Sequence, residues 1–144
     1  PLPTTRGGRG ILVLDRALCD AIQHEVRRSG AVPRLHLMSI PVPLDDLAAK
    51  LEEFPWGYLV TVRDDGRAQS LAVPTQYVDG GLVASVGRRT AAHATARPAV
   101  TLMFPGATGA DYSLIVDGDA KAFDDHVEVT PTWAVMHRPA LAGD

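Results

Sequence analysis

Two periodicities divide the chain, and the boundary between them lies near Pro55. Before it, apolar residues recur at the three- and four-residue spacing of an amphipathic helix. This spacing predicts one helix over residues 15–29 and a second from Leu44 to Phe54. Asp45 and Asp46 fall in the first turn of the second helix, where negative charge favours the helix dipole. The first part of the chain is therefore expected to be helical.

Beyond Trp56, the pattern changes to short β-rich runs separated by turn residues, which is typical of a barrel or sandwich. The turn residues between the runs predict antiparallel neighbours. A short helix is expected at Thr90–Ala96, ending before Pro98 because the residue preceding a proline is pushed out of the α region. The fold class is therefore mainly β, with six strands: Tyr58–Arg63, Ala68–Tyr77, Leu82–Val86, Val100–Phe104, Tyr112–Ala122 and His126–Val129.

The boundary of the barrel domain is expected at Met38. Residues 1–37 are predicted to be an N-terminal extension with one helix, and residues 38–144 the barrel. The stretch from Met38 to Pro41 is typical of a translation start that leads directly into the second helix. The alternative interpretation is that Met38 is an internal methionine in a loop.

Charge and cysteine content narrow the classes of partner. The chain carries 14 basic and 17 acidic residues, for a formal net charge of -3, which argues against a general polyanion-binding surface and hence against nucleic acid. Its single cysteine, Cys19, allows neither an intramolecular disulfide nor a multi-thiolate zinc site, and it suits the reducing cytoplasm. No apolar run approaches the ~20 residues needed to span a bilayer, so no membrane partner is expected.

Familiar catalytic motifs are absent. The sequence has no G-x-S-x-G, Walker A, Rossmann G-x-G-x-x-G or H-E-x-x-H motif, so no catalytic residue is identified. The five histidines lack the spacing of metal ligands, and no metal site is predicted. Among them, His93 is the first candidate for a functional role, because it lies on the predicted short helix.

A candidate anion site lies in the segment Ser85–Thr90, where a strand ends and that helix begins. Backbone N–H groups at a helix start favour anions, and the two guanidinium groups of Arg88 and Arg89 add charge-assisted donors suited to phosphate. The alternative interpretation is a solvated arginine pair in a loop, which the dipeptide alone favours.

The order of several motifs along the chain favours the anion site over the solvated arginine pair. The chain carries, in sequence, Gly66-Arg67, Val73-Pro74, Gly87-Arg88-Arg89, Arg97-Pro98-Ala99-Val100 and Val116-Asp117-Gly118-Asp119-Ala120. From about Leu44 to Ala140 it resembles the pyridoxamine 5'-phosphate oxidase-like superfamily. The resemblance implies a six-stranded antiparallel split β-barrel of the FMN-binding type, working as a homodimer with its cofactor between the subunits.

The same resemblance implies the site. Arg89 and Thr90 match the positions that hold the cofactor phosphate, although the lysine common in this loop is Thr90 here. Polar residues also alternate along a strand for purely structural reasons, which is the competing interpretation of the strand that begins at Ala68. The implied cofactor-binding residues are Arg67, Gln69, Ser70, Ser85, Gly87, Arg88, Arg89 and Thr90.

The C-terminal stretch Val129–Pro139 looks like small actinobacterial members of the superfamily, including deazaflavin-dependent relatives. The implied cofactor is thus a deazaflavin coenzyme of the F-420 type or FMN, and the implied function is a reductase that transfers a hydride to an unidentified small acceptor. Oxidation of pyridoxamine phosphate is not expected. Two alternatives stay open: a non-catalytic flavin-binding protein for storage or sensing, and an interaction domain with an empty cleft.

Overall fold

The computed structural model describes residues 38–140, together with residues 17, 20, 21, 23, 24 and 28. Most of the helix predicted over 15–29 lies outside the described residues, and its described members are helical. One of them, Gln23, donates a hydrogen bond from Nε2 to the Pro41 carbonyl at 2.6 Å. In this part of the chain, no helix has the length and apolar character needed to cross a membrane.

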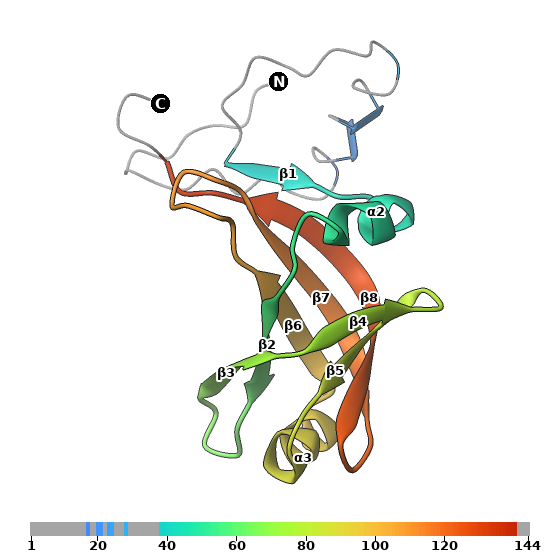
Figure 1. Ribbon diagram of the computed structural model, residues 1–144, viewed down its shortest axis with the longest axis vertical. Coiled ribbons are helices and arrows are strands. Elements are labelled where there is room, and N and C mark those ends of the chain that lie inside the picture. Colours follow the sequence, from blue (N-terminus) through green and yellow to red (C-terminus); the bar gives the residue numbers. More distant parts are fainter. Residues whose placement is uncertain (1–16, 18–19, 22, 25–27, 29–37, 141–144) are drawn as a thin grey trace.

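One curled antiparallel sheet forms the body of the fold (Figure 1). Seven strands pair in the order β3-β2-β6-β7-β8-β5-β4, and β1 pairs with β8 beside this path. The short helices α2 and α3 lie near opposite ends of the curled sheet. The bounds are β1 Ser39–Pro41, β2 Gly57–Val62, β3 Ala68–Val73, β4 Thr75–Val78, β5 Gly81–Ser85, β6 Ala99–Phe104, β7 Ser113–Ala122, β8 His126–His137, α2 Leu47–Leu51 and α3 Arg88–Ala96.

The predicted hairpins are confirmed. Strand β2 pairs antiparallel with β3, β4 with β5, and β6 with β7. The turn residues explain two of these connections, because Gly66 and Gly80 have φ of 83° and Asp79 has φ of 49°, values that glycine and aspartate tolerate better than most residues. The mainly β fold class follows directly from these local signals.

The prediction of six strands was wrong, because the sheet has eight. The predicted strand Ala68–Tyr77 is two strands, β3 and β4, which separate at Pro74. Proline has no N–H to donate to a neighbour, so the chain changes partner there. Before Pro74 it pairs with β2, and after it with β5. The two outer strands of the pairing path are therefore consecutive in sequence.

The last strand is longer than predicted. We expected it to end at Val129, but β8 continues to His137. Pairing with β5 ends at Val129, so Pro131 lies where only β7 is alongside. A bulge follows, because Asp117 pairs with Trp133 and Gly118 with Pro131, which leaves one β8 residue without an opposite partner. On the side where β5 has ended, β8 has no neighbour with which Pro131 could fail to form a hydrogen bond.

The second predicted helix is shorter than expected. A 3₁₀ turn over Leu44–Asp46 precedes α2, which ends at Leu51. Asp45 and Asp46 lie in the first turn, as predicted. The core fills the concave side of the sheet and includes these buried residues: Leu47, Leu59, Leu82, Ala84, Val100, Leu102, Phe104, Leu114, Val116, Val127, Val129 and Ala134.

The predicted domain boundary at residue 38 can be tested directly. A chain that begins at Met38 should unfold cooperatively, with a denaturant midpoint close to that of the full chain. It retains β1 paired with β8 and the hydrogen bond from the Arg138 N–H to the Met38 carbonyl, 2.9 Å long. Urea unfolding followed by circular dichroism checks this. Loss of the cooperative transition would mean that the helix predicted over 15–29 belongs to the core.

Candidate functional site

The segment predicted to bind an anion lies at the start of α3. Strand β5 ends at Ser85, and Gly87 is the N-cap residue, with φ of -81° and ψ of 167°. No side chain caps this end, and the first turn contains no acidic residue. The first N–H groups of a helix have no acceptor within it. The start of α3 therefore offers free backbone donors to an anion, and the first turn itself adds no negative charge.

Arg88 and Arg89 are the first two residues of α3, and both side chains are exposed. Neither forms an ion pair with another described residue. The two differ in surroundings, because Arg88 lines a pocket of about 300 Å3 that also includes Phe123 of the β7–β8 turn, whereas Arg89 does not. The pair thus supplies two uncommitted cations beside uncapped backbone donors.

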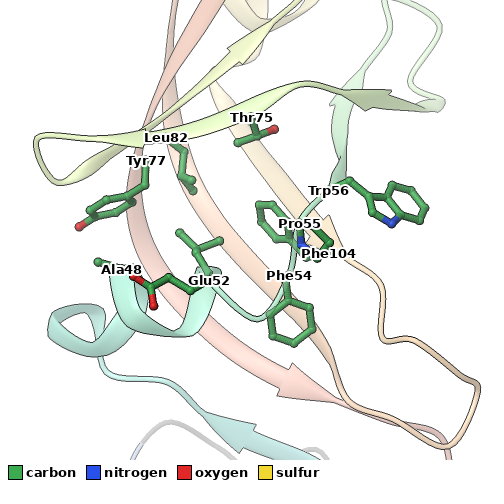
Figure 2. Close-up of a pocket in the computed structure, with 10 residues that line it drawn as sticks. Ala48, Glu52, Phe54, Pro55, Trp56, Thr75, Tyr77, Leu82 and Phe104 are labelled. Atoms are coloured by element: carbon green, nitrogen blue, oxygen red, sulfur yellow. The ribbon is translucent and has the colours of Figure 1, made fainter.

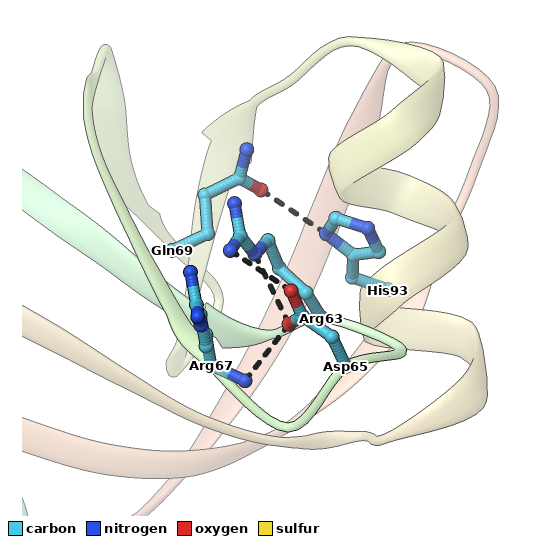
Figure 3. Close-up of polar contacts among 5 residues, drawn as sticks. All are labelled: Arg63, Asp65, Arg67, Gln69 and His93. Carbon is cyan, nitrogen blue, oxygen red and sulfur yellow. Dashed lines mark hydrogen bonds and ion pairs between the residues drawn. The ribbon is translucent and has the colours of Figure 1, made fainter.

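Gln69 and Thr90, predicted from different segments, lie together in the structure. The Thr90 hydroxyl donates to the Gln69 Oε1 atom at 3.4 Å. The Nδ1 atom of His93 lies 3.1 Å from the same oxygen, and Figure 3 shows the histidine reaching it from α3. Thr90 and His93 are buried, with 4% and 7% of their surfaces exposed. The Thr90 hydroxyl is therefore engaged within the protein, while its N–H belongs to the first turn.

Arg67 immediately precedes β3 and is two residues before Gln69, the spacing at which side chains of an extended chain share a face. Its backbone N–H donates to the Asp65 Oδ1 atom at 3.0 Å, and the Asp65 carboxylate also binds Arg63 (Figure 3). Backbone donation from Arg67, the largest cause, and the Arg63 guanidinium lower the pKa of Asp65. The β2–β3 turn is thereby fixed beside Gln69.

Ser70 and Ser85 are not brought to this side. Ser70 is exposed and alternates with Gln69, so it faces the opposite side of β3. Ser85 is also exposed, next to the inward-facing Ala84, and it pairs with His126 of β8. Of the eight predicted residues, the two serines therefore lie on the outer face. Gln69 of β3 and Thr90 of α3, by contrast, lie within hydrogen-bond distance of each other.

Sequence reasoning missed an aromatic region at the α2 end of the sheet. One pocket of about 470 Å3 lies between α2 and strands β4 and β5, and Figure 2 shows its side chains. A second, of about 500 Å3, shares the segment Phe54–Trp56 with it. None of the eight predicted residues lines either pocket. The one available signal of this region was the closeness of Phe54 and Trp56 in sequence, which flank the boundary between the helical and the β periodicity. The aromatic residues in the two linings are Phe54, Trp56, Tyr77, Phe104 and Tyr112.

The β7–β8 turn carries an ionisable group beside the loop that leads to α3. His126 Nδ1 lies 2.7 Å from Asp125 Oδ1, and its ring stacks on Phe123. The hydrogen bond to Asp125 raises the pKa of His126 above its ordinary value of 6.5; desolvation opposes this, and the charges of Asp125 and Glu128 add to it. The Val86 N–H donates to the Asp125 carbonyl, so this turn supports the loop.

A pH dependence of stability follows. Because the folded pKa of His126 is raised, its contribution is complete below the unfolded pKa of 6.5 and is lost as pH rises through the higher folded value. The His126→Gln variant should therefore be less stable than the parent near pH 5.5 and nearly equal to it near pH 9. Urea midpoints across this range measure the difference. A constant difference would show that stacking on Phe123, and not charge, is responsible.

Among the described residues, no three histidine, cysteine, aspartate or glutamate side chains gather as a metal site would require. The chemistry available at the start of α3 is instead that of hydrogen-bond donors and positive charge. Such an arrangement suits the phosphate of a small molecule better than it suits a metal ion.

Comparison with solved structures identifies the fold. A protein from Listeria innocua, provisionally named a pyridoxamine 5'-phosphate oxidase, aligns with a TM-score of 0.56 and 13% identity over 65% of this chain and 96% of its own. An F-420 reductase aligns with a TM-score of 0.53 and 22% identity, over 65% and 98%. An FAD-binding protein from Mesorhizobium loti gives 0.54 and 14%, over 70% and 98%. The chain has the split-barrel fold of the pyridoxamine 5'-phosphate oxidase-like proteins.

Sequence comparison identifies closer relatives. No family model matches the chain. Two mycobacterial proteins of uncharacterised function, Mb0449c of Mycobacterium bovis and MT0457 of Mycobacterium tuberculosis, are each 37% identical to it over 119 residues. The alignment covers 69% of this chain and 82% of each relative. The actinobacterial relationship expected from the C-terminal stretch is in keeping with these two sources. The chain belongs to the same family as these two mycobacterial proteins.

Proposed function

We propose that the protein is a flavin- or deazaflavin-dependent reductase that passes a hydride to a small acceptor. The observation that carries the proposal is the start of α3, an uncapped helix end that presents Arg88 and Arg89 next to the paired Gln69 and Thr90. In a fold shared with proteins named as an F-420 reductase and an FAD-binding protein, this is a suitable place for a cofactor phosphate.

The residues fit such a group on chemical grounds. Free backbone N–H groups, two guanidinium groups and a side-chain amide are all donors, and no carboxylate lies in the first turn of α3. Arg89 and the N–H groups of the first turn would hold the phosphate, and Gln69 and Arg67 would contact the adjoining part of the cofactor. The bound cofactor supplies the hydride, and the chain supplies orientation and exclusion of water.

Between the two cofactors, we favour the deazaflavin coenzyme. The mycobacterial relatives and the 22% identity to an F-420 reductase support this choice. The experiment is a side-by-side titration of the purified protein with FMN and with the deazaflavin coenzyme, followed by absorbance and fluorescence. Tight binding of FMN with no measurable binding of the deazaflavin would overturn the choice of cofactor but leave the phosphate site intact.

The titration, followed by addition of acceptors to the protein loaded with reduced cofactor, separates the proposed reductase from the alternatives. Cofactor that stays bound but is never oxidised by any of a panel of quinone-like and unsaturated acceptors would favour a storage or sensing protein. A protein with no affinity for either cofactor would instead be an interaction domain of the same fold.

A homodimer is part of the proposal. Strands β3 and β4 form the open ends of the pairing path, and apolar side chains nearby are exposed, including Leu71 at 38%, Tyr77 at 38% and Val78 at 46%. A second copy would cover this surface. We expect a dimeric mass by light scattering at micromolar concentration, and a Leu71→Lys variant should shift the population toward monomer. A monomeric parent with cofactor bound would rule out a site shared between subunits.

A further inference from the structure

Buried polar side chains gather at the junction of α3 with β2 and β3. In the part of the chain that the structure describes, four polar residues are buried, and three of them are here: Thr61, Thr90 and His93. Thr61 is directly opposite Gln69 in the β2–β3 pairing, and its buried hydroxyl has no hydrogen-bond partner. Burying polar groups in an otherwise apolar core costs stability unless they are satisfied, so the cluster calls for an explanation beyond packing.

The hydrogen bonds around Gln69 bear on which ring nitrogen of His93 carries a hydrogen. The Gln69 Oε1 atom can only accept, and it lies 3.1 Å from His93 Nδ1. In this arrangement, a hydrogen bond between the two forms with the hydrogen on Nδ1 of His93. The Thr90 hydroxyl donates to the same oxygen at 3.4 Å, so both neighbours hold the amide in one orientation.

That orientation decides what Gln69 offers to a ligand. With its oxygen held by α3, its NH2 group points away from His93, as Figure 3 shows, and no other described residue accepts a hydrogen bond from it. If Nδ1 lacked its hydrogen, the amide would turn to donate to it and would present an oxygen outward instead. An outward oxygen would repel a phosphate, whereas an outward NH2 group binds one.

We propose that His93 is a positioning residue whose Nδ1–H holds the Gln69 amide with its two N–H bonds available to an oxygen of the cofactor at the start of α3. The inference rests on the proposed function for its ligand, but not for the hydrogen on Nδ1 of His93. It adds to the predicted site a residue that never touches the ligand.

The position of the ring hydrogen of His93 is tested first, on the full chain without any ligand. Nitrogen-15 spectra of the histidine rings distinguish the two neutral forms. We expect His93 to carry its hydrogen on Nδ1, and the form protonated on Nε2 alone would overturn the inference whatever the protein binds.

Binding is tested with two substitutions of His93. His93→Phe removes the donor, and His93→Asn keeps an amide N–H near the place of Nδ1. We expect His93→Phe to weaken binding of the phosphate-bearing cofactor about five- to tenfold, the value of one ordinary hydrogen bond, and His93→Asn to restore most of the affinity. In a Gln69→Leu background, His93→Phe should have no further effect, because the two residues act as one unit.

A parallel Arg89→Ala measurement separates the two ways of failing. If Arg89→Ala weakens binding but His93→Phe binds as the parent does, the positioning role is overturned while the proposed function stands. If neither cofactor binds the parent, the proposed function fails while the spectra still decide the state of His93. Equal losses in His93→Phe and His93→Asn would show that His93 only packs, and thermal unfolding would reveal the same loss in stability.

Discussion

Replacing Arg89 by alanine is expected to weaken binding of a phosphate-bearing cofactor by about ten- to a hundredfold. A hydrogen bond to a charged group is worth ~1.5–3 kcal/mol, and each 1.4 kcal/mol or so is a factor of ten in the dissociation constant. The side chain is exposed at the first turn of α3, and the structure gives it no ion pair with a described residue whose loss would disturb the fold. Titration of the variant with FMN or the deazaflavin coenzyme measures the change.

Two controls belong to this measurement. Riboflavin lacks the phosphate, so its affinity should hardly respond to Arg89→Ala. Arg88→Ala should cost less, because Arg88 lines the shallow pocket near Phe123 and exposed charge pairs contribute only ~0–1 kcal/mol. Equal losses at both positions would mean that both guanidinium groups clamp the anion. Unchanged affinity for both cofactors in Arg89→Ala would end the assignment of a phosphate to this helix start.

Replacing Gly118 by alanine is expected to destabilise the fold by about 2–3 kcal/mol, the upper part of the range for overpacked cores. A Cβ atom there would lie 2.6 Å from the Thr130 carbonyl oxygen and 2.6 Å from a methyl group of Val129. Neither neighbour can withdraw freely, because both belong to β8 at its pairing with β7 next to the bulge. Urea unfolding measures the loss.

Gly109→Ala is the matched control, because no atom lies within 4 Å of the Cβ that it would add. It should change the free energy of unfolding by only a few tenths of a kcal/mol. A Gly118→Ala variant as stable as this control would mean that the bulge relaxes. The glycine of the motif Val116-Asp117-Gly118-Asp119-Ala120 would then have no packing explanation.

Local signals were sufficient for the mainly β class and for the turns, since alternation and residues such as Gly66 and Gly80 act over a few positions. Non-local pairing was not predictable in this way. Strand β8 pairs with β5 up to Val129 and with β1 from Val135, so Pro131 lies in the stretch where β7 is its one neighbour in the sheet. The change of partner at Pro74 was missed for the same reason, because the outer strands of the pairing path are defined by the whole sheet.

The site shows the same division. Family resemblance selected Gln69 and Thr90 from segments 21 positions apart, and the structure brings them within hydrogen-bond distance. The contact of His93 with the same amide was not predictable, because helix spacing alone does not say which strand faces α3. The aromatic pockets were missed because Tyr77 of β4 and Phe104 of β6 come to line one pocket with Phe54 only in the folded sheet.

The junction at Pro74 also limits how the protein can assemble. An exposed edge strand is ordinarily a template on which further chains add without end. Here, an added strand could follow β3 for six residues or β4 for four. At Pro74, between them, the chain changes its pairing partner from β2 to β5 and lacks an N–H to offer. Strand addition at this surface is therefore self-limiting. The protein can offer open edges to a single neighbour while remaining poorly suited to fibre growth.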